Sequence, residues 1–227
     1  MTTAVKERPI IFSTDMVRAI LDGRKDQTRR VMKPQPTKIP DDCDQSEAEY
    51  WWSSAALRSM VRIGGWELAP LHTCCPYGQV GDHLWVRETH YKWTGLGNPP
   101  TDFIQDRCYS DNYQFESLWS GAILVTVPSI FMPRWASRIN LEITGIRVER
   151  VQEITEDDAT AEGSPSFFLT SAIDGKPFDT VIPSFWFETL WDTINAKRGY
   201  GWDVNPWVWV IEFKNLQQDL TTIVRPK

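Results

Sequence analysis

The residues best suited to chemistry are a lysine and a threonine three positions apart, Lys25 and Thr28, in the most basic stretch of the chain. A threonine hydroxyl attacks a carbonyl only if a neighbour takes its proton. A lysine can do so only when its pKa falls well below the usual value of about 10.4. Burial and the like charges of Arg24, Arg29 and Arg30 would lower the pKa of Lys25. The stretch therefore predicts a nucleophile close to a base, although such a charge run also fits a solvated turn.

A helix, a glycine turn and a strand are expected to hold this pair. The helix would run from Thr14, the predicted N-cap, to the turn at Gly23, which supplies the left-handed residue that ends a helix. Residues 27–31 then alternate in polarity and predict a strand. This strand would carry Thr28 and Arg30 on the same side.

Several other segments predict the sheet that this unit would join. They are short, rich in β-branched and aromatic residues, and bounded by turn residues. The predicted strands are Pro9–Phe12, Gly81–Arg87, Ile123–Val127, Ile139–Thr144, Ile146–Val151 and Trp207–Phe213. The last of these has the strongest strand pattern. Gly145 separates two of them, which indicates a meander with a bulge or a turn at this glycine.

Two further helices are predicted in the second half of the chain. The first has Thr155 as its N-cap, Asp158 at the capping-box position and Gly163 as its stop signal. The second spans residues 184–194 and gathers apolar residues on one face.

Taken together, these segments resemble the ASCH family of PUA-like proteins. The stretch Ile20–Arg30 matches the ILxGRKxxTxR signature of its bacterial N4-acetylcytidine amidohydrolases. Gly81–Arg87 and Trp207–Phe213 match two of the family's strands, and the pattern is also similar to ASCH proteins of phages and prophages. The resemblance implies an α+β fold, with a small PUA-like β-barrel, flanking helices and loop-rich insertions.

The resemblance also implies an active site made of a lysine, a threonine and a glutamate. By the motif the first two are Lys25 and Thr28, and the glutamate is Glu162, near the end of the helix that Thr155 caps. Without the resemblance, Glu162 would be an ordinary last-turn helix residue. The predicted catalytic residues are thus Lys25, Thr28 and Glu162, in a cleft with Arg30. The predicted substrate-binding residues are Arg24, Arg29, Arg30 and Trp85.

The function that follows is binding of a nucleoside or RNA and hydrolysis of a modified pyrimidine of the N4-acetylcytidine type. One alternative is a non-catalytic module that binds RNA or a modified base, in which Lys25 and Arg30 only contact phosphates or base oxygens. Another alternative is a ribonuclease that uses the same lysine and glutamate. The residues leave these possibilities open.

The charge of the chain limits its partners. The 227 residues carry a net charge of −6, which argues against a broad duplex-binding surface. Residues 15–38 are a local exception, with seven Lys or Arg against three Asp. Such a patch suits a small anionic ligand or a short single strand. The twelve tryptophans could stack on bases, but most are expected in the core.

Composition predicts one domain over residues 1–227, interrupted by insertions at about 33–75, 92–121 and 164–183. These segments are rich in proline, glycine and acidic residues. The insertions could cover the site or bind a host protein, for which an exposed tryptophan patch in residues 51–66 would be the sign.

No cofactor, metal or membrane is expected. The sequence contains no phosphate-binding loop or dinucleotide-binding glycine motif. His72, Cys74 and Cys75, with Cys43 or Cys108, lack the paired spacing of a zinc site. No apolar run is long enough for a transmembrane span, and no secretory signal is evident, so a cytoplasmic location with reduced cysteines is expected.

Overall fold

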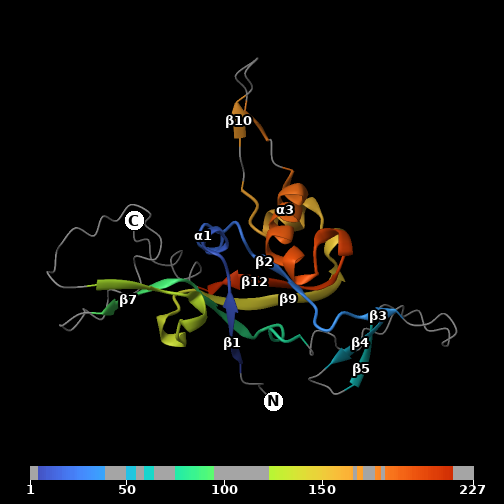
Figure 1. Cartoon of the computed structure of the whole chain (residues 1–227), viewed down its shortest axis with the longest axis horizontal. Coiled ribbons are helices and arrows are strands. Elements are labelled where there is room, and N and C mark those ends of the chain that lie inside the picture. Colours follow the sequence, from blue (N-terminus) through green and yellow to red (C-terminus); the bar gives the residue numbers. More distant parts are fainter. Residues whose placement is uncertain are drawn as a thin grey trace, which may run out of the picture.

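The fold is built on a mixed sheet of five strands. The computed structural model describes residues 5–38, 50–54, 59–63, 75–94, 123–165, 168–170, 177–179 and 182–216. Across the sheet the strands are β1 (Glu7–Ile11), β6 (His83–Arg87), β9 (Asn140–Arg150), β12 (Trp207–Asn215) and β2 (Gln27–Val31). β1 and β6 are parallel, and the other neighbours are antiparallel. Figure 1 shows the long strands β9 and β12 crossing the middle of the molecule.

The α+β class is confirmed, but the predicted closed barrel is not observed. The described strands form an open sheet, with β1 and β2 as its two edges. A side chain joins these edges: the guanidinium of Arg30 on β2 donates from Nη2 to the carbonyl oxygen of Ile11 at 2.7 Å. In a closed barrel, a ladder of backbone hydrogen bonds would join the two edge strands, whereas here a side-chain hydrogen bond joins them.

The helix before β2 has the predicted extent but a different cap. α1 spans Thr14–Leu21, and Ser13 rather than Thr14 is its N-cap, because the Ser13 hydroxyl accepts the backbone N–H of Met16. Gly23 follows with φ +72°, the left-handed conformation expected there. The chain then enters β2 over the predicted residues.

The predicted meander at residues 139–151 is instead one continuous strand, β9. Opposite it on β12, Glu212 pairs with Gly145 and Phe213 pairs with Ile143, so Thr144 is the extra residue of a β-bulge. Gly145 has no side chain because a Cβ there would collide with the carboxylate of Glu212. The glycine therefore marks a close approach within a strand.

Two hydrophobic cores cover the two faces of the sheet, because β12 alternates between them. Trp209 and Ile211 enter the main core, which also takes α1 through Val17 and Ile20. The second core lies on the other face and includes Val208 and Val210 of β12, Ala159 of α2, and Phe187 and Trp191 of α3. β12 is therefore buried on both sides.

The helices of the second core agree closely with the predictions. α2 spans Glu156–Ala161, and Thr155 caps it by accepting the backbone N–H of Asp158. α3 spans Pro183–Asn195. Its predicted apolar face is wrong at Ile194, which is 38% exposed, whereas Asn195 is buried.

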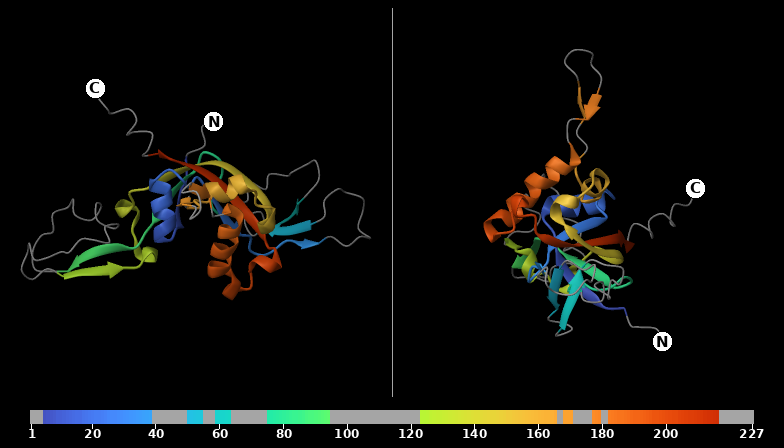
Figure 2. Two further views of the ribbon diagram at one scale, coloured as in Figure 1. Left: turned by 90° about the horizontal axis from the view of Figure 1, so that it is seen from above. Right: turned by 90° about the vertical axis from the view of Figure 1, so that its right-hand side faces the viewer.

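In the described part of the chain, three smaller sheets lie outside the central one, together with short 3-10 turns. The sheets are β3 (Thr37–Lys38) with β4 (Tyr50–Ser54) and β5 (Ser59–Ile63), β7 (His90–Thr94) with β8 (Ile123–Val127), and β10 (Phe168–Thr170) with β11 (Pro177–Asp179). The turns are η2 (Ser129–Phe131), η3 (Arg134–Ala136), η4 (Val151–Glu153), η5 (Ala196–Arg198) and η6 (Trp202–Val204). The sheets β3–β5 and β7–β8 lie at opposite ends of the molecule (Figures 1 and 2).

The three small sheets fall in or beside the ranges predicted as insertions, but β8 does not belong to the main sheet as expected. It pairs only with β7 among the described strands. The tryptophan side chains of residues 51–66 lie outside the part of the chain whose side chains are described. No helix among the described residues has the length and apolar character needed to cross a membrane.

Replacing Gly163 with alanine is expected to destabilise the fold more than the same change at Gly199. Both glycines have positive φ, +94° and +80°, so each alanine carries a left-handed penalty of about 1–2 kcal/mol. A Cβ on Gly163 would also lie 2.9 Å from the Cβ of buried Ala19, whereas nothing lies within 4 Å at Gly199. Overpacking should add about 1 kcal/mol or more at Gly163. Urea unfolding of the two variants measures the difference, and equal losses would contradict this account.

Candidate functional site

Lys25 is held by backbone hydrogen bonds at the junction of α1, β2 and α2. Its N–H donates to the carbonyl oxygen of Ala19 at 3.1 Å, within the turn that ends α1. A β-bridge pairs it with Glu162 at the end of α2, and next to it Asp26 donates its N–H to the carbonyl oxygen of Ala161. The turn after α1 and the distant end of α2 therefore fix the position of this lysine together.

The ammonium group of Lys25 is buried and fully hydrogen-bonded. Its side chain has no exposed surface. Nζ donates to the carbonyl oxygens of Gln27 at 2.7 Å and Glu162 at 2.9 Å, and to Glu162 Oε2 at 2.6 Å. An ammonium has three donors, and all three are used. Nζ also lies 5.6 Å from the centroid of the Phe12 ring.

Glu162 has one carboxylate oxygen bound and one without a hydrogen bond. Oε2 accepts from Lys25, while Oε1 is buried and accepts no hydrogen bond from the described residues. Nη1 of Arg29 lies 3.5 Å from Oε1. A buried acceptor without a hydrogen-bond donor is uncommon in folded proteins.

Burial lowers the pKa of Lys25 below its ordinary value. The negative charge and the hydrogen bond of Glu162 oppose this effect, while the positive charges of Arg30 and Arg29 add to it. The sequence predicted these opposing influences but not which would prevail. The effect of burial prevails. It lowers the pKa of Lys25, which is the direction that a general base needs.

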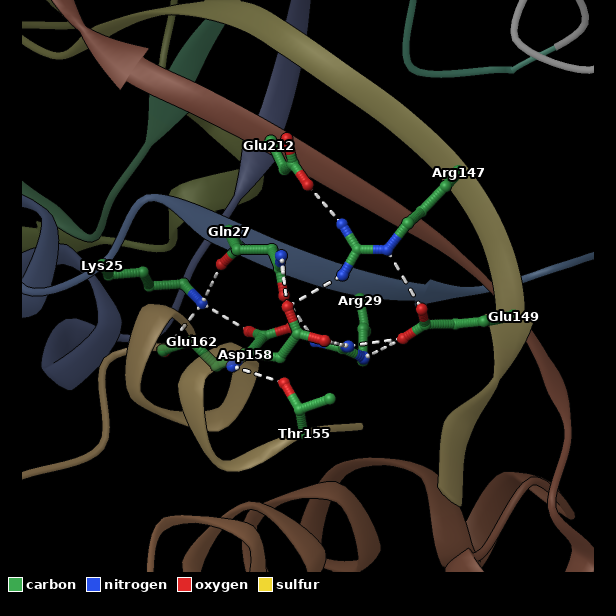
Figure 3. A network of polar contacts seen from close by, with 9 residues as sticks. All are labelled: Lys25, Gln27, Arg29, Arg147, Glu149, Thr155, Asp158, Glu162 and Glu212. Atoms are coloured by element: carbon green, nitrogen blue, oxygen red, sulfur yellow. Dashed lines mark hydrogen bonds and ion pairs between the residues drawn. The ribbon is translucent and has the colours of Figure 1, made fainter. Parts of the chain in front are cut away.

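A network of ion pairs surrounds this pair on the side of α2 (Figure 3). The guanidinium of Arg29 has no exposed surface, and it makes four hydrogen bonds, to Gln27, Asp158 and twice to Glu149. Burial opposes ionisation of Asp158. The hydrogen bond from Gln27 and the charges of Arg29 and Arg147 outweigh this effect and lower the pKa of Asp158 to about 2.

Arg147 extends the network across the sheet. From β9 it reaches Glu149 at 3.0 Å and Asp158 at 2.8 Å, and it also pairs with Glu212 on β12. The network therefore connects β2, β9, β12 and α2. It positions the elements that carry Lys25 and Glu162.

Of the predicted catalytic residues, the fold brings Lys25 and Glu162 into contact but not Thr28. Thr28 is 3% exposed and pairs with Ile211 in the sheet. Its strand alternation points it away from Gln27 and Arg29, and no hydrogen bond joins its hydroxyl to Lys25 or Glu162 in the described part of the chain. The three side chains are buried, so they do not line an open cleft as expected.

The predicted substrate-binding residues lie in different environments. Arg24 is exposed and contacts Asp22 and the carbonyl oxygen of Gly163, while Arg29 is committed to the network. Arg30 lies against the Phe12 ring at 5.1 Å, the same ring that Lys25 approaches.

Trp85 lies apart from the Lys25 contacts. The residue is 8% exposed, and two guanidiniums lie near its ring, Arg87 at 4.8 Å and Arg134 at 5.9 Å from the centroid. The side chain is therefore a packed cation–π partner and not an open surface for stacking.

Several residues of the site were missed in the sequence. They are Phe12, Gln27, Arg147, Glu149 and Asp158. Asp158 was assigned to helix capping, whereas its carboxylate accepts from three side chains of the network. Alternating polar residues on β2 and β9 were the only available signal, and this signal does not identify partners across 120 residues.

Replacing Lys25 with methionine is expected to cost about 3–5 kcal/mol of unfolding free energy, because it leaves the Glu162 carboxylate buried without its main partner. Adding Glu162→Gln should restore part of the loss, since the second change removes the unpaired charge. A double-mutant cycle by urea unfolding tests this coupling. Strictly additive effects would show that the pair does not interact as described.

Stability is expected to fall in acid through Asp158. Its folded pKa of about 2 lies below the ordinary value of 3.8, so its contribution is present above about pH 4 and is lost as pH falls through 2. Asp158→Asn should therefore destabilise the protein at neutral pH and flatten this part of the stability profile. Asp157→Asn, an exposed neighbour on α2, is the control. Parallel profiles for Asp158→Asn and the parent protein would refute the assignment.

Comparison with known proteins gives little beyond these residues. No protein-family model matches the chain, and no curated protein matches it. A solved structure, described as an ASCH domain from Lactobacillus crispatus JV V101, aligns with 14% identity and a TM-score of 0.38. The alignment covers 92% of this chain and 79% of that chain. This similarity is too loose to establish a family, so the resemblance to ASCH domains rests on the Ile20–Arg30 motif.

Proposed function

We propose that this protein hydrolyses the acyl amide of a modified cytidine of the N4-acetylcytidine type, with Lys25 and Glu162 as its proton-transfer pair. One observation carries the proposal. The Lys25 ammonium and the Glu162 carboxylate meet at 2.6 Å in a buried position, although 137 residues separate them. The Ile20–Arg30 motif implies Lys25, and the family resemblance implies Glu162. Perturbed ionisable pairs of this kind occur at active sites, although structural ion pairs share the feature.

The proposed reaction has two stages. Transfer of a proton from the Lys25 ammonium to Glu162 leaves Lys25 neutral. Lys25 then takes the hydroxyl proton of Thr28, and Thr28 Oγ1 attacks the acyl carbon. The bond from that carbon to the N4 nitrogen breaks, and the nitrogen takes the proton of Glu162 as it leaves as the free amine of cytidine. Water then hydrolyses the acyl-threonine ester and releases the carboxylic acid. Because no hydrogen bond joins Thr28 to Lys25 within the described residues, this scheme requires a local rearrangement when the substrate binds.

Glu162 has the features needed to handle the second proton. Its Oε1 accepts no hydrogen bond from the described residues, and because it is buried, the substrate must open the site before Oε1 can contact the leaving nitrogen. Its Oε2 contacts Lys25, which gives a direct path for a proton between the two side chains. The pair would thus serve as base and acid in turn.

A second candidate function is binding without reaction. It is favoured by the three hydrogen bonds of Lys25, which use every donor of the ammonium in the structure. A substrate must displace one of these bonds before Lys25 can act as a base. If it does not, the site would only bind a modified base or RNA.

The test is incubation of the purified protein with N4-acetylcytidine and, in parallel, with labelled single-stranded RNA, followed by chromatography. Cytidine is expected as the product. Lys25→Met and Thr28→Val should each lower the rate by about 100-fold or more, since general base catalysis contributes at least this much. Thr28→Ser should retain activity because it keeps the hydroxyl.

Other outcomes distinguish the alternatives. Shortened RNA that depends on Lys25 and Glu162 would indicate a ribonuclease. Unchanged substrates that nevertheless bind would indicate a binding module. Circular dichroism of each variant separates loss of activity from loss of fold.

A further inference from the structure

Large apolar side chains project into water from the segment that holds the 3-10 turns η2 and η3. Ile130, Phe131 and Trp135 are 58%, 69% and 69% exposed. Met132 and Ala136, in the same segment, are buried. The segment is therefore attached to the protein by two residues and presents one aliphatic and two aromatic side chains outward. Exposed apolar groups that gather in one place mark interaction surfaces.

Hydrogen bonds hold this segment against β6 near both of its ends. At the start, Nη1 of Arg87 donates to the carbonyl oxygen of Ile130 at 3.2 Å. At the end, the hydroxyl of Ser137 donates to the carbonyl oxygen of Val86 at 2.8 Å. The exposed side chains between these points are thus carried by a segment that is fixed to the sheet.

The exposed apolar surface continues onto the edge strand β1. The parallel register of β1 and β6 pairs Pro9 with Trp85 and Ile11 with Arg87. Paired residues of neighbouring strands point to the same face of a sheet, about 4.8 Å apart. Pro9 is exposed, and Ile11 is 43% exposed. Since Arg87 also binds the carbonyl oxygen of Ile130, the outward side of β1 and the turn η2 adjoin the same arginine.

Charges of both signs lie within this surface. The guanidiniums of Arg87 and Arg134 lie 4.8 and 5.9 Å from the centroid of one ring, that of Trp85. Arg134 is paired with Glu7 at 2.8 and 2.9 Å, and the Glu7 side chain remains 45% exposed. Arg87 forms no ion pair with a described residue, and its Nε is buried without a hydrogen bond. The surface therefore has a cation that lacks a counter-charge and a carboxylate that is still accessible.

We propose that this surface joins two copies of the chain in a symmetric dimer. In a two-fold interface each surface meets its own copy, so it must be complementary to itself. Apolar side chains satisfy this condition, and so does a pair of opposite charges, because Arg87 of one copy would face the partner subunit's Glu7 and the reverse. This inference does not depend on the proposed function. The surface, named the η2–η3 patch, comprises Glu7, Pro9, Ile11, Arg87, Ile130, Phe131, Arg134 and Trp135.

The composition and area of the η2–η3 patch fit a second copy of the chain. Aromatic side chains bury about 150–250 Å² each, so Phe131 and Trp135 provide the apolar centre of an interface that typically buries about 800 Å² per partner. Aromatic residues and arginine are enriched in such centres. A nucleic-acid strand fits less well, because Ile11 and Ile130 cannot stack on bases and the chain has a net charge of −6.

Sedimentation velocity of the full chain tests the dimer. The parent protein is expected to sediment as a dimer at micromolar concentration. Phe131→Ser and Trp135→Ser should each raise the dissociation constant of the dimer by at least about tenfold, because each removes an aromatic side chain from the centre of the interface. Phe185→Ser is the matched control, since Phe185 is 66% exposed but lies on α3, and it should leave the dissociation constant unchanged.

Two charge reversals test the symmetry of the interface. Arg87→Glu and Glu7→Arg each bring like charges together across the two-fold axis, so each variant alone is expected to be a monomer. Mixed in equal amounts, the two variants bring opposite charges together at both contacts and should form a dimer again. Mixing cannot repair the Glu7–Arg134 pair within one chain, so recovery of the dimer would come only from contacts between copies.

Three results would overturn the inference. They are a monomeric parent protein at high micromolar concentration, a dimer that Phe131→Ser and Trp135→Ser leave intact, and a mixture of the charge reversals that stays monomeric. Binding of single-stranded RNA or lipid vesicles by a monomer, lost in Trp135→Ser, would assign the η2–η3 patch to that occupant instead. Turnover of N4-acetylcytidine is measured separately, so a dimer without turnover would uphold this inference and overturn the hydrolysis.

Discussion

The structure depends on the burial of one ammonium group. Removing the charge of Lys25 from water costs several kcal/mol, which must be offset by acceptors in good geometry. Those acceptors come from two places, the carbonyl oxygen of Gln27 at the start of β2 and the carbonyl and carboxylate of Glu162 at the end of α2. The turn after α1, the edge strand and a distant helix must therefore meet at one point before the lysine can be buried.

The ion network beside Lys25 gives this meeting point its rigidity. Arg29 and Arg147 contact carboxylates on β9, α2 and β12, and Asp158 receives hydrogen bonds from both of them and from Gln27. Partly buried networks of this kind are favourable only when each member finds its partners. A change in the register of β2 would place Arg29 on the wrong face, so the network and the sheet support one another.

The polar groups that remain unpaired are as informative as the network. Glu162 Oε1 is an acceptor without a donor, and Arg30 Nε is a donor without an acceptor. Both lie close to groups that approach Phe12, in a region where other charges are paired. A buried polar atom without a hydrogen bond is uncommon, so these two atoms mark where the folded chain leaves polar groups unsatisfied.

The sequence by itself determined the local elements, because their signals act over a few residues. Periodicity and capping gave α1, α2 and β2 close to their observed extents, and Gly23 and Gly163 adopt the left-handed conformations expected of helix stops. The Ile20–Arg30 motif selected Lys25, and the resemblance selected Glu162. That the two side chains meet is a fact of the folded chain.

Only the tertiary structure decided the remaining features, because contacts between residues far apart in the sequence produce no periodic pattern in it. Gly145 reads as a turn, but it lies within β9, where it pairs with Glu212 of β12 and a Cβ would meet the Glu212 carboxylate. Trp85 reads as a stacking surface, but arginines approach its ring. Arg29 and Arg30 are adjacent and chemically identical. Strand alternation turns them to opposite faces of the sheet, where Arg29 meets carboxylates and Arg30 meets a backbone carbonyl. Only the packing of the two faces shows which arginine is paired with carboxylates.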